Sequence, residues 1–402
     1  MSLQYLSAPY HRLDALELKN TARMGIALQN ESDLQQLLLR IVCTNSALNT
    51  LSLNRYGQYT TREFWKACLE RLGELQSVNV LDVHIDDDAF SWFWATLARA
   101  ERISVTSSSW EVDTNSKSPI NEVVSRWPDP ALRLAAQQVE ICDLSFESVL
   151  QQWQVLVQCS EARAIRWRCF NIGVPALSLR HILSPEIWPQ LQRLDLGTSG
   201  ISDESISLLL DTVNPLLHLS AYDTCFGKLA TQSLLLRHIT ALQYLYLSGC
   251  TEMTSPDIQR ILTSGNQLET FKAFRLHVEV LEYPDSKPWV CTELKSLKLY
   301  FDIQLRDAHT AHRLVFEQLA RLPHMQVFDI SRAHNDLTWT SLRLRLDFGL
   351  NLIAGWKNLV ELQVTQVLQD LETEDAEWMA KHWCLTRMEG SLNSNEKKHK
   401  TL

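Results

Sequence analysis

Few residues of this 402-residue chain have the types and spacing that catalysis or metal binding requires. The sequence has no phosphate-binding loop, dinucleotide fingerprint, Gly-x-Ser-x-Gly elbow or His-Glu-x-x-His helix. The run Asp86, Asp87 and Asp88 lacks the alternating ligands and the glycine of a calcium loop, so we interpret it as a solvated turn. His309 and His312 share an expected helix without a third ligand at a suitable spacing. We therefore predict a non-enzyme with no catalytic residues, no metal site and no cofactor.

Nine cysteines are scattered along the chain, and none forms a Cys-x-x-Cys pair. Zinc sites and thioredoxin-like redox motifs use such close pairs, so neither is indicated. The odd count and the absence of a signal-peptide pattern favour reduced thiols in a cytoplasmic or nuclear protein. We expect these thiols to be buried as small hydrophobic side chains.

The overall composition excludes two further classes of protein. A net charge of −9 argues against general nucleic-acid binding, which needs a basic surface. No run of 18 apolar residues occurs, so we expect no membrane-spanning segment. The hydrophobic content of 45% is typical of a folded, water-soluble chain.

A repeated six-residue pattern is the dominant feature of the sequence. Five segments carry apolar residues at their first, fourth and sixth positions, and their starts are 25 or 26 residues apart. They begin at Leu191, Leu216, Leu242, Leu268 and Leu294. Eight more segments repeat the pattern with looser spacing and a ninth, at Leu385, is degenerate; the eight begin at Leu13, Leu48, Leu75, Ala100, Ala136, Ala162, Met325 and Leu359.

Each unit combines a short strand with a helix. Apolar residues at alternate positions indicate a strand that is buried on one side. The sequence Ser255-Pro256-Asp257 then predicts a helix start with Ser255 as N-cap, and Gly265 can end that helix. Parallel strands on one side and helices on the other satisfy this repeat. We predict one elongated domain over 1–390 with about fourteen units, an insertion loop at 107–121, and a disordered tail at 391–402.

The segment LQYLYLSGCTEMTSPDIQRIL, which begins at Leu242, resembles the cysteine-containing leucine-rich repeat. Cys250 holds the cysteine position and Thr254 the threonine of the lead-in to the helix. The unit at Leu191 matches the same lead-in at Ile201 and Asp203. These repeats are similar to the ribonuclease-inhibitor-like class of F-box/leucine-rich-repeat proteins, and the ending AEWMAKHWCLTRMEG resembles the terminal repeat of fungal members. The resemblance implies an α/β leucine-rich-repeat solenoid, a curved horseshoe with parallel strands on its concave face and helices on its convex face.

The resemblance also implies a function. Members of this family recognise substrates as adaptors of SCF ubiquitin ligases, and they bind Skp1 and cullin through an N-terminal F-box. No F-box is recognisable here, because Leu3 and Leu13 already match repeat material. A Skp1/cullin link therefore requires an F-box upstream. The alternative is a leucine-rich-repeat regulator of a protein partner, such as a small GTPase, with no ligase link. Ser199, Gly249 and Cys250 stand where the GTPase-activating class carries Asn, which disfavours that alternative.

Strand alternation identifies the side chains that a partner would meet. We expect five aromatic residues to lie on neighbouring strands about 5 Å apart, namely Tyr222, Tyr244, Tyr246, Phe274 and Tyr300. Five basic residues suit an acidic or phosphorylated partner, namely Arg166, Arg168, Arg193, Lys272 and Lys298. These ten residues are our predicted protein-binding site on the concave face of a monomer. Alternatively, the rings stack along the strands to stabilise the sheet, or an insertion covers them.

Overall fold

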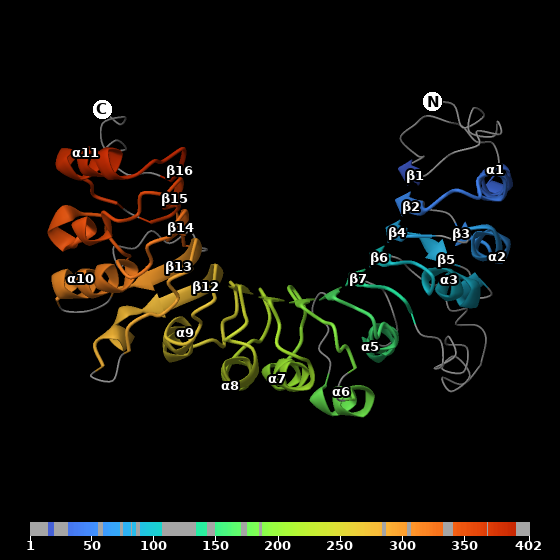
Figure 1. Cartoon of the computed structure of the whole chain (residues 1–402), viewed down its shortest axis with the longest axis horizontal. Coiled ribbons are helices and arrows are strands. Elements are labelled where there is room, and N and C mark those ends of the chain that lie inside the picture. Colours follow the sequence, from blue (N-terminus) through green and yellow to red (C-terminus); the bar gives the residue numbers. More distant parts are fainter. Residues whose placement is uncertain are drawn as a thin grey trace, which may run out of the picture. The chain divides into compact units, whose positions relative to one another are not determined.

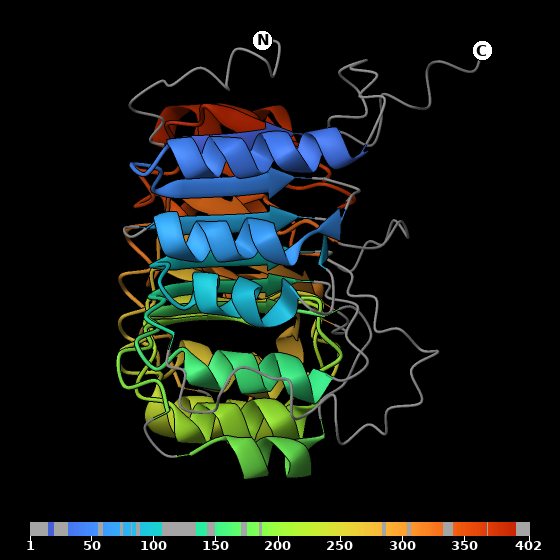
Figure 2. The ribbon, with the colours of Figure 1, turned by 90° about the vertical axis from the view of Figure 1, so that its right-hand side faces the viewer.

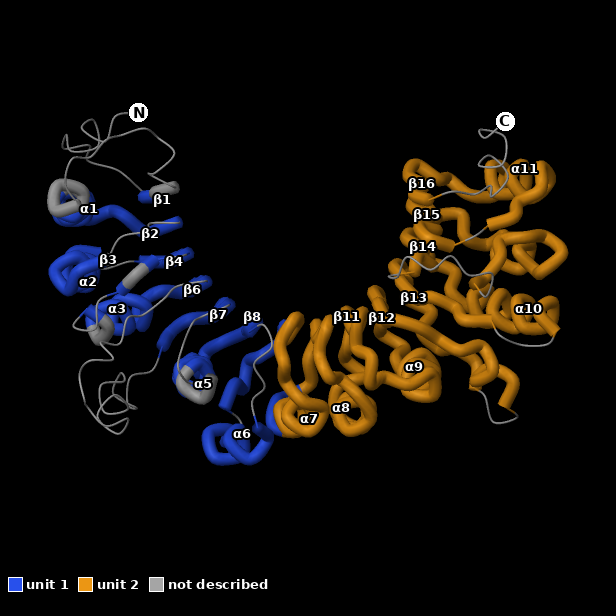
Figure 3. The backbone as a smooth tube through the Cα atoms, turned by 180° about the vertical axis from the view of Figure 1, so that it is seen from behind, with its two compact units in different colours: residues 1–195, 212–214 blue, residues 196–211, 215–402 orange. Residues whose placement is uncertain are grey.

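The computed structural model describes residues 15–19, 31–54, 59–72, 75–81, 83–85, 89–106, 134–142, 149–169, 175–184, 187–283, 287–303, 307–332, 341–367 and 369–390. They divide into two compact units, unit 1 with residues 1–195 and 212–214 and unit 2 with residues 196–211 and 215–402 (Figure 3). That residues 1–390 form a single domain stays a prediction. The insertion loop at 107–121, the tail at 391–402 and Asp86–Asp88 lie outside the described residues.

In unit 1, parallel strands pair in the order of the chain. They are β1 (Ala15–Lys19), β2 (Thr50–Asn54), β4 (Ser77–Leu81), β6 (Arg102–Thr106), β7 (Gln138–Cys142), β8 (Ala164–Arg168) and β9 (Arg193–Asp195). One line of buried apolar side chains runs in register through them, namely Leu16, Leu51, Val78, Ile103, Val139, Ile165 and Leu194. The helices are α1 (Glu31–Thr44), α2 (Arg62–Arg71), α3 (Phe90–Leu97), α5 (Val149–Gln158) and α6 (Ala176–Ile182). The short strands β3 (Tyr59–Thr60) and β5 (His84–Ile85) pair separately, which the sequence did not indicate.

Unit 2 repeats this arrangement. Its strands are β10 (His218–Ser220), β11 (Tyr244–Leu247), β12 (Thr270–His277), β13 (Ser296–Asp302), β14 (Val327–Asp329), β15 (Glu361–Gln363) and β16 (Arg387–Glu389). Their buried line is Leu219, Leu245, Phe271, Leu297, Phe328 and Leu362. The helices are α7 (Asp203–Thr212, of which Thr212 is assigned to unit 1), α8 (Lys228–Arg237), α9 (Ser255–Leu262), α10 (Ala308–Leu319) and α11 (Thr373–His382). The described residues of this unit also form the 3₁₀ helices η4 (Val278–Leu281), η5 (Leu346–Phe348) and η6 (Leu350–Ile353).

The predicted α/β leucine-rich-repeat solenoid is confirmed. Each of the fourteen six-residue segments overlaps a strand, and all the pairings among these strands within each unit are parallel. Within each unit the strands line one side of the stacked repeats and the helices line the other side (Figure 1, Figure 2). The side chains of each strand therefore alternate between a core shared with the helices and a surface that we call the strand face.

Small polar side chains close the ends of the central strands. The Ser199 hydroxyl donates to the Leu196 carbonyl oxygen at 2.6 Å, and the Thr224 hydroxyl donates to the Ala221 carbonyl oxygen at 2.7 Å. The Cys250 thiol also donates to the Ala221 carbonyl oxygen, at 2.9 Å. Burial raises the pKa of the Cys250 thiol to about 11, so it keeps the proton that this hydrogen bond uses. The cysteine of the repeat therefore serves as a hydrogen-bond donor.

Helix starts in unit 2 depend on side chains from neighbouring positions. The N-cap of α9 is Thr254, which forms a capping box with Asp257, so our assignment of Ser255 was wrong by one residue. The Ser255 hydroxyl instead accepts the backbone N–H of His277 at 2.8 Å. Asp203, at the start of α7, reaches the next helix: its carboxylate accepts the backbone N–H groups of Gly227, Leu229 and Ala230 at 2.8–2.9 Å.

We predict that Asp203→Ala lowers the free energy of unfolding by about 1–3 kcal/mol, because three backbone N–H groups at the start of α8 lose a charged acceptor. Urea denaturation measures this change. The control is Gln232→Ala on the exposed side of α8, which we expect to be nearly neutral. Equal stability of the two variants would show that the Asp203 contacts contribute nothing.

His238 is a buried histidine with both ring nitrogens bonded. The Leu216 backbone N–H donates to Nδ1 at 3.1 Å, so the ring proton is on Nε2, which donates to the Leu210 carbonyl oxygen at 2.8 Å. Burial lowers the pKa of His238 below 6.5, and the charge of Arg237 acts in the same direction. Protonation would also break the bond from Leu216. The folded chain therefore holds this ring neutral.

The lowered pKa sets the sign of a pH dependence. Below pH 6.5 the unfolded chain binds a proton at His238 that the folded chain does not, so this group's contribution is complete above pH 6.5 and is lost as the pH falls below it. We expect His238→Gln, whose amide can replace both bonds, to lose less stability than the wild type between about pH 7.5 and about pH 5.5. Burial lowers the pKa of His312 too, so the stability of the His238→Gln variant still depends in part on pH. Urea titrations at both pH values measure these losses. Equal losses for His238→Gln and the wild type would refute this role of His238.

Candidate functional site

Two stacked pairs of rings lie on the strand face of unit 2. The Tyr222 and Tyr246 rings are stacked with centroids 4.9 Å apart, and the His218 and Tyr244 rings are stacked at 4.0 Å. All four side chains are half-buried, and His218 and Tyr244 are register partners on β10 and β11. We call these four residues the aromatic row. The sequence analysis predicted that the three tyrosines of this row lie close together, as the structure has them. It did not assign His218 to the binding site.

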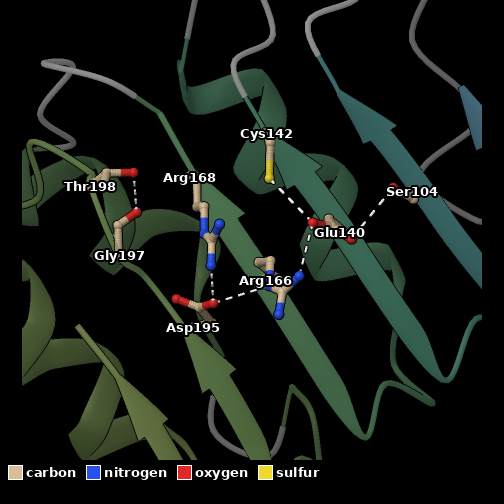
Figure 4. Close-up of polar contacts among 8 residues, drawn as sticks. All are labelled: Ser104, Glu140, Cys142, Arg166, Arg168, Asp195, Gly197 and Thr198. Carbon is tan, nitrogen blue, oxygen red and sulfur yellow. Dashed lines mark hydrogen bonds and ion pairs between the residues drawn. The ribbon is translucent and has the colours of Figure 1, made fainter. Parts of the chain in front are cut away.

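Gly197 supports one end of the aromatic row. A Cβ atom at this position would lie 2.1 Å from Cε1 of Tyr222, so the ring occupies the space that any other side chain would take. The glycine is consequently buried. The Gly197 carbonyl oxygen accepts the Thr198 hydroxyl at 2.7 Å (Figure 4). The position of the Tyr222 ring thus depends on a glycine in the preceding repeat.

Two lysines extend the aromatic row across the next strands. Tyr246, Lys272, Lys298 and Asp329 are successive register partners on β11 to β14. The Lys272 ammonium lies 5.3 Å from the Tyr246 ring centroid, within cation–π range. The Lys298 Nζ atom lies 2.9 Å from Oδ2 of Asp329. Among the described residues, Lys272 has no acidic partner within 4.0 Å, so its charge is available to a ligand.

The structure separates Phe274 and Tyr300 from the aromatic row. The register of β12 and β13 shifts after Lys272, so that Arg275 rather than Phe274 is the partner of Tyr300. Tyr300 is only 5% exposed, and the Arg332 guanidinium lies 5.6 Å from its ring centroid. The prediction of an exposed Tyr300 was therefore wrong. Phe274 is half-buried beside Arg275, whose guanidinium carbon is 6.0 Å from the ring centroid.

A charged ladder occupies the strand face of unit 1 (Figure 4). Arg166 contacts Glu140 at 3.1 Å and Asp195 at 3.0 Å, and Arg168 contacts the same Asp195 oxygen at 2.8 Å. The Ser104 hydroxyl lies 3.5 Å from the other oxygen of Glu140. Burial lowers the pKa of Arg166, but the two carboxylates outweigh it and raise the pKa overall.

The ladder changes the predicted basic site. Two arginines face two carboxylates, so their charges cancel, and Arg166 and Arg168 do not form the positive surface that we expected. Glu140 was missed because it lies 26 residues from Arg166 in the sequence. Arg193 is exposed and makes no ion pair within the described part of the chain. Of the five predicted basic residues, Arg193 in unit 1 and Lys272 in unit 2 thus have no carboxylate partner among the described residues.

His309 and His312 on α10 both contact the ring of Phe348. The His312 ring is buried and stacks on Phe348 at 4.4 Å, and the His309 ring meets the same phenyl ring edge-on at 5.8 Å. In the described residues, no three His, Cys, Asp or Glu side chains are grouped as metal ligands. No helix in that part of the chain is long and apolar enough to span a bilayer.

Comparisons with known proteins give likenesses in structure alone. No family model and no curated protein matches the chain. A chain of the Rad7 and Elc1 complex in yeast is 16% identical, with a TM-score of 0.40, over 89% of this chain and 73% of that one. An internalin (inlF) from Listeria monocytogenes is 12% identical, with a TM-score of 0.42, over 96% and 88%. The Arabidopsis receptor kinase HAESA ectodomain, in complex with an IDA peptide hormone ligand, is 13% identical, with a TM-score of 0.43, over 96% and 55%.

We predict that Gly197→Ala lowers the free energy of unfolding by about 1–3 kcal/mol, because the new methyl group collides with the Tyr222 ring. In a Tyr222→Ala background the same substitution should cost less than half as much, since the obstructing ring is gone. A double-mutant cycle by urea denaturation measures this coupling. Equal costs in both backgrounds would mean that the glycine does not support the ring.

Proposed function

We propose that this chain is a non-catalytic scaffold that holds a protein partner on the strand face of unit 2. The observation that carries the proposal is the aromatic row with Lys272 beside it. Tyrosine supplies a large contact area at a low entropic cost, and tyrosines and cations are enriched where partners bind most tightly. The side chains are only partly buried although the rings stack, so a partner can bury the rest of their surface.

The stacking also fits a purely structural role, in which the rings stabilise neighbouring strands. Two features favour binding. β10 and β11 are short, with three and four residues, and their buried leucines already join them to the core. Lys272 also lies beside the row, and its ammonium has no acidic partner among the described residues. A charge placed there adds little to the core and can orient a ligand.

We propose further that the chain is the substrate-recognition part of an SCF-type ubiquitin-ligase adaptor. The repeat at Leu242 and the ending at Leu385 support this role through their resemblance to F-box/leucine-rich-repeat proteins. A regulator that binds a protein such as a small GTPase is the alternative. The two roles differ in whether Skp1 and a cullin belong to the same complex.

We expect the double variant Tyr244→Ala/Tyr246→Ala to bind the partner at least about thirtyfold more weakly, which is the loss typical of an interface hot spot. Its thermal midpoint should move by only a few degrees, since both side chains lie on the strand face and are only partly buried. Quantitative affinity capture, with identification of the bound proteins, measures the first effect, and calorimetry measures the second. The control is Leu236→Ala, which removes a side chain that is 83% exposed on α8.

Four outcomes are informative. Recovery of Skp1 and a cullin with the wild type supports the ligase role, and stable partners without them support the regulator. Equal capture by the wild type and the double variant would place the binding surface elsewhere. A large fall in the melting temperature of the double variant would assign the rings to fold stability.

A further inference from the structure

A pocket of about 530 Å³ lies at the carboxyl end of β12. Met253 and Pro256 line it from the segment that leads into α9, Phe274 and Arg275 line it from β12, and Tyr283 lines it after η4. None of the four rings of the aromatic row lines this pocket. It is therefore separate from the aromatic row, and the sequence pattern did not indicate it.

The pocket depends on two departures from the regular repeat. The register of β12 and β13 shifts between Lys272 and Arg275, and Phe274 and Arg275, which lie at this shift, both line the pocket. β12 then continues to His277 and η4 follows it directly, whereas turns follow β9, β10, β11 and β15. The hydrogen bond from the His277 backbone N–H to the Ser255 hydroxyl joins the two walls. The shape of the pocket is consequently built into the backbone.

Arg275 is the charged group that a ligand would meet. Its side chain is 42% exposed, and its Nη1 atom lies 3.7 Å from Oδ2 of Asp302, which is longer than a hydrogen bond. His277 is closer to that carboxylate, with its Nδ1 atom 3.2 Å away. Within the described residues, the five N–H donors of Arg275 form no hydrogen bond. A guanidinium in this state can bind a carboxylate through two parallel hydrogen bonds.

The surrounding charge favours an acidic ligand. The segment around the pocket comprises β12, β13, β14 and Arg332. It carries two more positive than negative side chains, because four are cations (Lys272, Arg275, Lys298 and Arg332) and two are carboxylates (Asp302 and Asp329). Glu279 also lines the pocket, and one positive charge remains when it is counted. This excess occurs in a chain whose net charge is −9.

The walls of the pocket favour an apolar group beside that acid. The apolar side chains of Met253, Pro256, Phe274, Val280 and Tyr283 line it, and Tyr283 is 63% exposed. The volume lies within the range of typical ligand sites and accommodates a branched or aromatic side chain. A large apolar side chain next to a carboxylate is a combination that peptide segments supply.

We propose that this pocket binds an apolar side chain of the partner protein while Arg275 binds a carboxylate from an adjacent acidic residue. The inference rests on the proposed function, because the segment belongs to the partner that the aromatic row holds. Arg275 fixes the orientation of the segment, and the apolar walls supply the buried area. Glu279 disfavours a second acidic group in the same space.

Synthetic peptides test this proposal with the full chain. The probes are Gly/Ser-rich 12-residue peptides, each with Leu, Phe or Trp beside Glu, Gln or Lys, and fluorescence anisotropy measures their dissociation constants. We expect the Glu peptides to bind most tightly. Arg275→Gln should weaken their binding roughly ten- to hundredfold, the loss of a charge-assisted pair. Glu279→Gln should leave it unchanged or strengthen it. The matched control, Arg260→Gln on α9, removes a half-exposed arginine outside the pocket and should have no effect.

The pocket proposal and the proposed function can be refuted independently of each other. Tighter binding of Lys peptides, equal binding of Glu and Gln peptides, no binding at about 1 mM, or unchanged binding by Arg275→Gln would each overturn the pocket proposal. Tyr244→Ala/Tyr246→Ala should not alter the binding of these short peptides. If this variant loses the partner while Arg275→Gln keeps it, the pocket proposal fails and the proposed function stands.

Discussion

The register of buried apolar side chains across parallel strands is the constraint on which the rest of the structure depends. In unit 2 this line includes Leu219, Leu245, Phe271 and Leu297, all fully buried. A slip of one residue would turn each strand over and expose its core side. Because the line is fixed, the residues on either side of each leucine must face away from the core. The positions of Tyr244, Tyr246 and Lys272 follow from that requirement.

The strand face is therefore free to vary in chemistry, and the two units use it differently. In unit 1, Arg166 and Arg168 are balanced by Glu140 and Asp195, which produces a neutral, hydrogen-bonded surface. In unit 2, stacked rings meet cations that the acids only partly balance. A surface with aromatic area and spare positive charge is better suited to a partner than a ladder in which every charge already has an opposite. The unit 2 face is accordingly where we place binding.

Sequence patterns predicted the strands well because period-two alternation and a spacing of 25 or 26 residues follow directly from the fold. They failed where the deciding contact comes from another repeat. The register shift that pairs Tyr300 with Arg275 instead of Phe274 depends on how β12 meets β13, and no local pattern shows it. The neutralisation of Arg166 depends on acids in the two neighbouring strands. The pocket beside Phe274 requires η4 and Tyr283, whose positions relative to α9 cannot be derived from alternation.

A structure of the chain bound to its partner would test most directly whether the strand face of unit 2 is the binding surface. We expect the partner to cover Tyr244 and Tyr246, with an acidic group within ion-pair distance of Lys272. A partner seated on the helix side of unit 2, with these tyrosines as exposed as they are in the unbound chain, would contradict the proposal.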